Sequence, residues 1–97
     1  MKQEKPAQRR LEAVVQGRVQ GVSFRFYTQR RAMELGLTGY VRNRWDGTVQ
    51  VIAEGQQAEL EDLLAFLRVG PRAALVTEVN IRWTAPSSEF ERFEVRY

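Results

Sequence analysis

The order in which two hydrophobic periodicities follow each other restricts the fold more than any other feature of this sequence. Apolar and polar residues alternate, as they do in strands with one buried face, over residues 11–16, 40–44, 48–54, 75–83 and 93–97. Asp46-Gly47 is a strong turn signal that joins the second and third of these segments as a hairpin. Two segments with apolar residues three and four positions apart, typical of amphipathic helices, lie between the strand patterns.

The first helical segment begins at Phe24, where we expect the side chain of Ser23 to cap it, and ends at Gly36. The second ends before Gly70-Pro71 and carries a stripe of Leu60, Leu63, Leu64 and Leu67. The order strand, helix, strand, strand, helix, strand, plus a terminal strand, predicts a ferredoxin-like α/β (α+β) sandwich. In this βαββαβ arrangement two helices cover one face of a mostly antiparallel sheet. We expect the leucine stripe, Phe24, Trp83 and Phe93 in the core.

Charge divides the 97 residues into two parts. Residues 1–10 hold four basic residues and one acidic residue, which accounts for the net charge of +3, so residues 11–97 are neutral overall. We therefore expect a basic flexible tail over residues 1–10, one domain over residues 11–97 and no nucleic-acid partner. No apolar run approaches the roughly 20 residues of a membrane span, and the first residues lack the apolar stretch of a secretory signal. We expect a cytoplasmic monomer that does not bind membranes.

The chain contains neither cysteine nor histidine. Disulfides, thiolate nucleophiles, the commonest general base and the commonest zinc ligands are therefore excluded. Carboxylates, arginine, asparagine, hydroxyls and backbone amides remain, a set suited to binding anions and positioning water. The acidic residues show no close metal-ligand spacing, so we expect no metal and no cofactor.

Candidate functional residues lie where the first strand passes into the first helix. Gly17 and Gly21 bracket a loop before the helix, and such a loop is either a tight connection or a cradle whose amides bind a tetrahedral anion. Arg25 lies in the first helical turn, where the helix dipole disfavours a cation. An anion bound by the guanidinium would offset this, as would a salt bridge to a carboxylate or exposure to solvent. Asn43 ends a strand, either as a turn residue or as a side chain that orients water.

Two segments resemble the signatures of the acylphosphatase family. Residues 15–25, Val-Gln-Gly-Arg-Val-Gln-Gly-Val-Ser-Phe-Arg, resemble the first signature. Residues 39–43, Gly-Tyr-Val-Arg-Asn, followed by Asp46-Gly47-Thr48-Val49 and Gly55, resemble the second. Gly70-Pro71 with Ala74, Val76 and Val79 also fits, so the resemblance extends from Leu11 to Tyr97.

The resemblance implies a ferredoxin-like fold and hydrolysis of acyl phosphates to a carboxylate and inorganic phosphate, without metal or cofactor. By the matching positions, Arg25 clamps the phosphate, Asn43 orients the attacking water, and the phosphate-binding loop consists of Arg18, Val19, Gln20, Gly21, Val22 and Ser23. The chemistry agrees, because a carboxylate leaving group, with a conjugate-acid pKa near about 4.3, needs no general acid. Phosphoryl transfer asks mainly for positioning and charge stabilisation.

Two alternatives stay open at this point. A non-catalytic phosphate-binding or RNA-contacting module could use the same fold, although the sequence lacks the aromatic-glycine signature of RNA-recognition motifs. An enzyme for another mixed anhydride, such as carbamoyl phosphate, could use the same residues. Phosphate release from acetyl or benzoyl phosphate, beside a p-nitrophenyl phosphate control, separates these functions.

Overall fold

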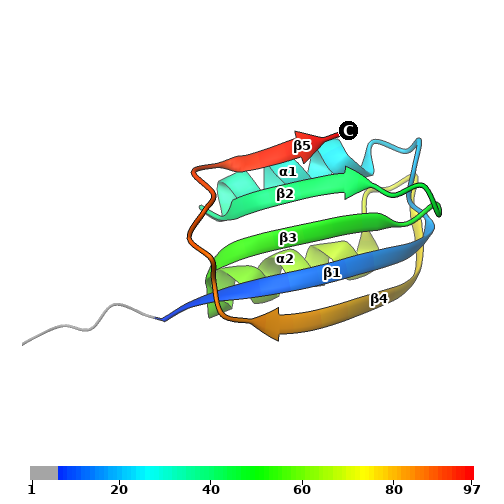
Figure 1. The fold of residues 1–97 in the computed structure, drawn as a ribbon. Helices are drawn as coiled ribbons and strands as arrows, with labels where there is room; N and C mark the ends of the chain where they lie inside the picture. The colour runs from blue at the N-terminus through cyan, green and yellow to red at the C-terminus, as the bar shows by residue number, and fades with distance from the viewer. Residues whose placement is uncertain (1–6) are drawn as a thin grey trace, which may run out of the picture.

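The computed structural model describes residues 7–97, which form five strands and two helices around a single sheet (Figure 1). Neighbouring strands are antiparallel except for β2 and β5, and the sheet order is β4-β1-β3-β2-β5. Both helices cover the same face (Figure 1). The predicted ferredoxin-like sandwich is therefore confirmed. The elements are β1 (Gln8–Arg18), α1 (Phe24–Glu34), β2 (Thr38–Asn43), β3 (Val49–Gln56), α2 (Gln57–Val69), β4 (Leu75–Thr84) and β5 (Phe93–Arg96).

The core lies between the helices and the sheet. Alternate residues of β1 are fully buried, as period-two patterning requires, and the leucine stripe of α2 packs against them. Each fully buried leucine contributes roughly 1.5–3 kcal/mol relative to an exposed one. The predicted core positions Phe24 and Phe93 are buried, whereas Trp83 is half-buried and packs at the edge of the core.

The first strand begins earlier than its apolar pattern predicted. Gln8, Arg9 and Arg10 pair with β3 and extend the ladder three residues before Leu11. Arg10 is held there because its guanidinium donates to the carboxylates of Glu12 and Glu54 at 2.9 and 3.0 Å. Backbone pairing, not apolar alternation, defines this end of the strand. The expected flexible tail is therefore wrong for residues 8–10, and its residues 1–6 lie outside the described residues.

A β-bulge changes the inward face of β4. Gln16 lies opposite Glu78 but Gly17 lies opposite Val76, so the alternation shifts by one residue. Val76 packs against the core, and Leu75, which the sequence pattern placed on the inner face, is 64% exposed. Gly17 has φ of 124°, and a Cβ there would lie 2.1 Å from the carbonyl oxygen of Leu75. Only glycine fits this close approach.

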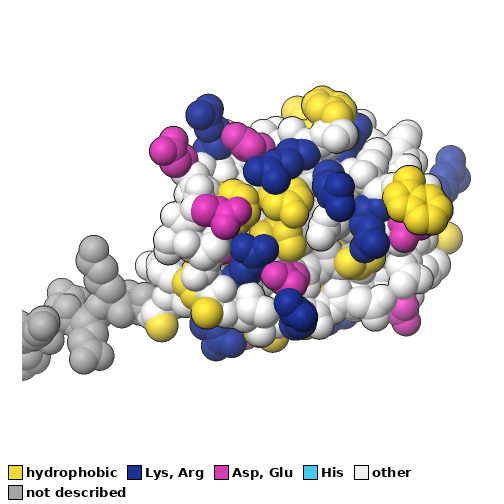
Figure 2. Space-filling view, viewed as in Figure 1, with side chains coloured by type: hydrophobic (Ala, Val, Ile, Leu, Met, Phe, Trp, Pro, Cys, Tyr) yellow, Lys and Arg dark blue, Asp and Glu magenta, His cyan; other side chains and the backbone are white. Residues whose placement is uncertain are grey.

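The face of the sheet away from the helices carries charges of both signs (Figure 2). Figure 2 shows basic and acidic side chains interspersed on it around a hydrophobic centre. Several of these charges are paired across neighbouring strands or along one strand, as in the Arg82–Glu12 and Arg96–Glu94 pairs. This face presents no continuous basic surface, in line with the neutral charge of residues 11–97.

Three segments far apart in the sequence meet at one end of the sheet (Figure 1). The β1–α1 loop (Val19–Ser23), the β2–β3 turn (residues 44–48) and the C-terminal residue all lie there. The antiparallel pairing of β1 with β3 and of β3 with β2 brings the end of β1 beside the end of β2.

Candidate active site

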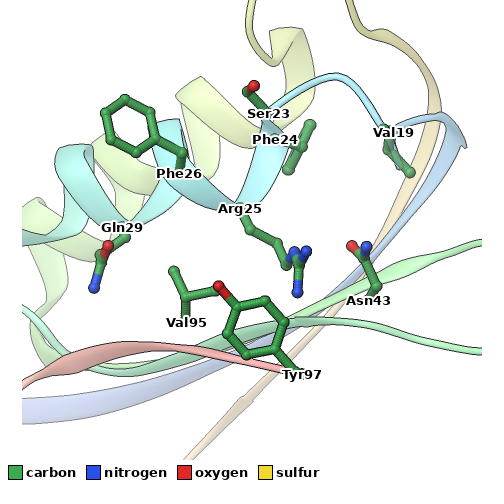
Figure 3. Close-up of a pocket in the computed structure, with 10 residues that line it drawn as sticks. Val19, Ser23, Phe24, Arg25, Phe26, Gln29, Asn43, Val95 and Tyr97 are labelled. Carbon is green, nitrogen blue, oxygen red and sulfur yellow. The ribbon is translucent and has the colours of Figure 1, made fainter.

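A cavity of about 500 Å³ opens at this end of the sheet (Figure 3). The β1–α1 loop, the first turns of α1, the end of β2 and the last residues of the chain contribute its walls. The lining residues are Val19, Gly21, Ser23, Phe24, Arg25, Phe26, Gln29, Asn43, Val95 and Tyr97.

The β1–α1 loop turns through two left-handed residues before the helix starts. Gly21 has φ of 74° and Ser23 has φ of 61°. Ser23 occupies the N-cap position of α1, but its side chain makes no capping hydrogen bond. The predicted serine cap is therefore wrong, because capping requires the extended conformation and not the left-handed one.

The amides of this loop are available to a ligand. Within residues 7–97, the backbone amides of Val19–Ser23 donate no hydrogen bond to the protein, and the first turn of α1 contains no acidic residue. The amides at a helix N-terminus also lack intrahelical partners, and the helix dipole is positive there. This combination suits an anion with several oxygens.

The six predicted loop residues do not all face the cavity. Val19, Gly21 and Ser23 line it, whereas Val22 packs against the core. Arg18 is the last residue of β1 and its side chain is exposed. The side chain of Gln20 turns away from the cavity lining toward the β2–β3 turn.

Arg25 extends from the first turn of α1 into the cavity (Figure 3). Its Nη1 donates to the carbonyl oxygen of Arg96 at 3.1 Å, and its guanidinium lies 4.6 Å from the centre of the Tyr97 ring. No carboxylate in residues 7–97 lies within salt-bridge distance of Arg25, so the salt-bridge alternative is wrong. The positive charge is oriented by neutral partners and remains available to an anion.

Asn43 is the last residue of β2 and points into the cavity near Arg25 (Figure 3). Its Oδ1 is buried, and no described group donates a hydrogen bond to it. A buried acceptor left in this state costs about 1–3 kcal/mol. Turn geometry alone does not explain that cost, whereas a donor bound beside Asn43, which lines the cavity, would offset it.

Sequence reasoning missed Tyr97 as a site residue. The alternating pattern placed it on a strand, but β5 ends at Arg96 and the Tyr97 side chain is fully exposed at the cavity. No local signal could have located it, because β5 reaches α1 and β2 through tertiary pairing. Phe26 was also missed, although an aromatic side chain that is 56% exposed beside Arg25 is unusual on a helix.

Two further kinds of feature are absent from the described part of the chain, residues 7–97. Residues 7–97 contain no group of three or more His, Cys, Asp or Glu side chains placed to hold a metal ion. In that same range, no helix combines the length and apolar character needed to cross a membrane.

Comparison with known proteins decides the family. The family model for acylphosphatase matches residues 11–95. The chain belongs to the acylphosphatase family. Acylphosphatases hydrolyse acyl phosphates, so the chain is a hydrolase acting on acid anhydrides, as its sequence predicted. The alternative of a non-catalytic binding module is thereby excluded.

Relatives with similar sequences span almost the whole chain. The acylphosphatase of Salinibacter ruber is 45% identical over 93 residues, which cover 96% of this chain and 98% of that protein. The acylphosphatase of Pasteurella multocida is 49% identical over 84 residues, or 87% of this chain and 93% of that one. The matched lengths show that one domain of this size constitutes nearly all of these relatives.

Solved structures agree with this assignment. The acylphosphatase of Bacillus subtilis superposes with a TM-score of 0.88 at 32% identity, covering 92% of this chain and 99% of that chain. Full-length HypF in its phosphate- and nucleotide-bound form superposes with a TM-score of 0.89 at 22% identity, covering 99% of this chain and 13% of that one. At this lower identity, the second match shows a shared fold alone.

Proposed function

We propose that this acylphosphatase binds the phosphoryl group of its substrate between the β1–α1 loop amides and Arg25, and that Asn43 orients the attacking water. One observation supports this most strongly: Asn43, whose buried Oδ1 accepts no hydrogen bond from any described group, lines the same cavity as Arg25, whose guanidinium has no carboxylate partner within residues 7–97. An acceptor for water and a donor set for phosphate are thus combined at one site.

The reaction needs little from the protein beyond placement. The water oxygen attacks phosphorus, the bond from phosphorus to the acyl oxygen breaks, and its electron pair leaves on the carboxylate. Both hydrogens of the water end on the phosphate product: one stays on the attacking oxygen and the other passes to a phosphoryl oxygen. A carboxylate leaves without protonation, and donors held in place stabilise the charge on the phosphoryl oxygens. Arg25 and the loop amides of Val19–Ser23 supply these donors, while Asn43 accepts a hydrogen bond from the water.

Two alanine variants separate binding from chemistry. We expect Asn43→Ala to lower kcat by about 10²–10³-fold, as for the loss of one preorganised group, and to leave phosphate affinity nearly unchanged. Inorganic phosphate at a hundred times its Kd then stabilises wild type and Asn43→Ala alike by about 2.7 kcal/mol. Arg25→Ala loses most of this stabilisation. Thermal unfolding with and without phosphate measures it.

Asn80→Ala serves as the control, because Asn80 lies on β4 and, among the described residues, its side-chain amide donates only to the nearby Glu78. We expect its kcat and its phosphate stabilisation to match wild type. If Asn43→Ala loses phosphate stabilisation as fully as Arg25→Ala does, Asn43 binds phosphate and the water-orienting role is wrong.

The choice among mixed anhydrides remains a proposal. We propose carboxylic acyl phosphates as substrates, with carbamoyl phosphate as the alternative. Rates of phosphate release from acetyl, benzoyl and carbamoyl phosphate, beside p-nitrophenyl phosphate, rank the substrates directly. A monomeric state, a cytoplasmic location and the lack of nucleic-acid and membrane partners stay predictions, which size-exclusion chromatography, cell fractionation and pull-down with nucleic acid or vesicles test.

A further inference from the structure

The side chain of Gln20 links two parts of the site that the backbone does not connect. Its Nε2 donates to the carbonyl oxygen of Arg44 at 2.7 Å and to that of Thr48 at 2.9 Å. Both carbonyls belong to the β2–β3 turn, which follows Asn43 directly. Gln20 itself lies in the middle of the β1–α1 loop, between the cavity-lining residues Val19 and Gly21.

The β2–β3 turn is closed by its own hydrogen bonds. The Arg44 amide donates to the Thr48 carbonyl at 2.8 Å, and the Gly47 amide donates to the Arg44 carbonyl at 3.2 Å. The carboxylate of Asp46 accepts from the amide of Thr48 at 3.0 Å and from its hydroxyl at 2.6 Å. By holding the Arg44 and Thr48 carbonyls, Gln20 holds this hydrogen-bonded turn.

Strand pairing in the centre of the sheet ends beside the cavity, at Asn43. Asn43 forms the last rung between β2 and β3, opposite Val49, and the pairing of β1 with β3 ends at the same residue of β3. Beyond this rung, the loop and the turn are not joined by strand pairing. Two hydrogen bonds from one half-buried amide group take the place of the ladder there.

We propose that Gln20 is a positioning residue for hydrolysis, whose side chain sets the distance between the β1–α1 loop amides and Asn43. This inference rests on the role proposed for Asn43. The reacting phosphorus and the attacking water are bound by different segments, and a misplacement of about 1 Å between them can lower the rate about 10²-fold. The side chain of Gln20 does not contact the substrate and acts through the geometry of the two segments.

The test uses Gln20→Glu, which keeps the size of the side chain but replaces the donating amide with an acceptor, and Gln20→Ala, which removes it. We expect both variants to lower kcat with benzoyl phosphate about 10- to 100-fold, while the Kd for inorganic phosphate changes little in Gln20→Ala, which adds no charge to the anion-binding loop. Gln50→Ala is the matched control, because Gln50 accepts from the Arg42 side chain on the open sheet face at 2.6 Å. We expect the control to keep wild-type kcat.

A double-mutant cycle distinguishes positioning from general structural support. If Gln20 acts through Asn43, adding Gln20→Glu to Asn43→Ala lowers kcat by less than about twofold further. If the two losses multiply, the inference is overturned. A fall in the phosphate affinity of Gln20→Ala as large as its fall in kcat also overturns it. Should Asn43→Ala by itself retain kcat, the water-orienting role fails first, and that result is independent of any Gln20 variant.

Acidification provides a second measurement. A protonated glutamate has one O–H donor, so the kcat of Gln20→Glu relative to wild type rises as the pH falls toward the usual glutamate range near about 4.3. Gln20→Ala has no group to protonate and shows no such rise. If kcat relative to wild type changes with pH in the same way in both variants, the proposed role of the hydrogen bonds from residue 20 to the β2–β3 turn is overturned.

Discussion

Arg25 is a cation at the positive end of a helix dipole. This placement loses about 0.3–1 kcal/mol relative to a neutral residue, and no acidic residue in the first turn of α1 offsets it. The carbonyl oxygen of Arg96 and the ring of Tyr97 orient the guanidinium without neutralising it. The position of Arg25 is therefore electrostatically unfavourable in the free protein. A bound phosphate would make it favourable.

We expect Arg25→Lys to be nearly as damaging as Arg25→Ala. A compact ammonium group cannot reproduce the planar fork that contacts two phosphate oxygens, nor the contact with the Tyr97 ring. Both variants should lose about 10²–10³-fold in kcat/KM. Steady-state kinetics with benzoyl phosphate measures this, with Arg30→Lys, on the exposed face of α1, as the control. More than about half of wild-type activity in Arg25→Lys would falsify the clamp role.

At the level of secondary-structure elements, the connection between β4 and β5 requires its own anchor. These strands are opposite edges of the sheet, so residues 85–92 pass across the ends of the central strands (Figure 1). Glu54 on β3 is 4% exposed and holds this connection. Its carboxylate accepts from the amide and hydroxyl of Ser87 at 2.8 and 2.9 Å, from the amide of Ser88 at 2.9 Å and from Arg10 at 3.0 Å.

We expect Glu54→Gln to lower the free energy of unfolding by about 1–3 kcal/mol, because hydrogen bonds to the ionised carboxylate are replaced by weaker ones. Burial opposes ionisation of Glu54, but the hydrogen bonds from Ser87, Ser88 and Arg10 prevail and lower its pKa. A lowered folded-state pKa gives stability that is present above the unfolded-state pKa and lost as the pH falls through the folded value. The difference between wild type and Glu54→Gln should therefore shrink below the usual pKa of 4.5.

Urea unfolding at a series of pH values measures this difference. Glu91→Gln is the control, because it makes the same change of charge at an exposed position on the same connection. Equal stability of the two variants at neutral pH would count against the anchor.

For the molecule as a whole, the proposed site combines the positive charge of Arg25 with the dipoles of the loop amides. We expect activity to survive exhaustive chelation with EDTA, because the sequence has neither His nor Cys and residues 7–97 hold no cluster of metal-ligating side chains. Phosphate release before and after chelation measures this. Loss of activity that added Mg²⁺ or Zn²⁺ restores would contradict the expectation.

Much of the fold, and two of the side chains that meet in the cavity, could be predicted from the sequence. The strand and helix patterns are local and periodic, and the signature residues directed attention to Arg25 and Asn43, which the structure brings to one cavity. The predicted serine cap was wrong because the loop backbone is left-handed at Ser23. The predicted start of β1 was wrong because the polar residues before Leu11 pair with β3, a contact between residues far apart in the sequence.

The sequence by itself determined the order of the elements, the buried faces of β1 and the helices, and the chemical groups available at the site, because each depends on residue type and local spacing. Only the tertiary structure decided that Tyr97 lies on Arg25, that Gln20 holds the β2–β3 turn and that Val76, not Leu75, faces the core. These features arise where residues distant in the chain meet, and strand register and backbone conformation set such contacts without leaving a local pattern.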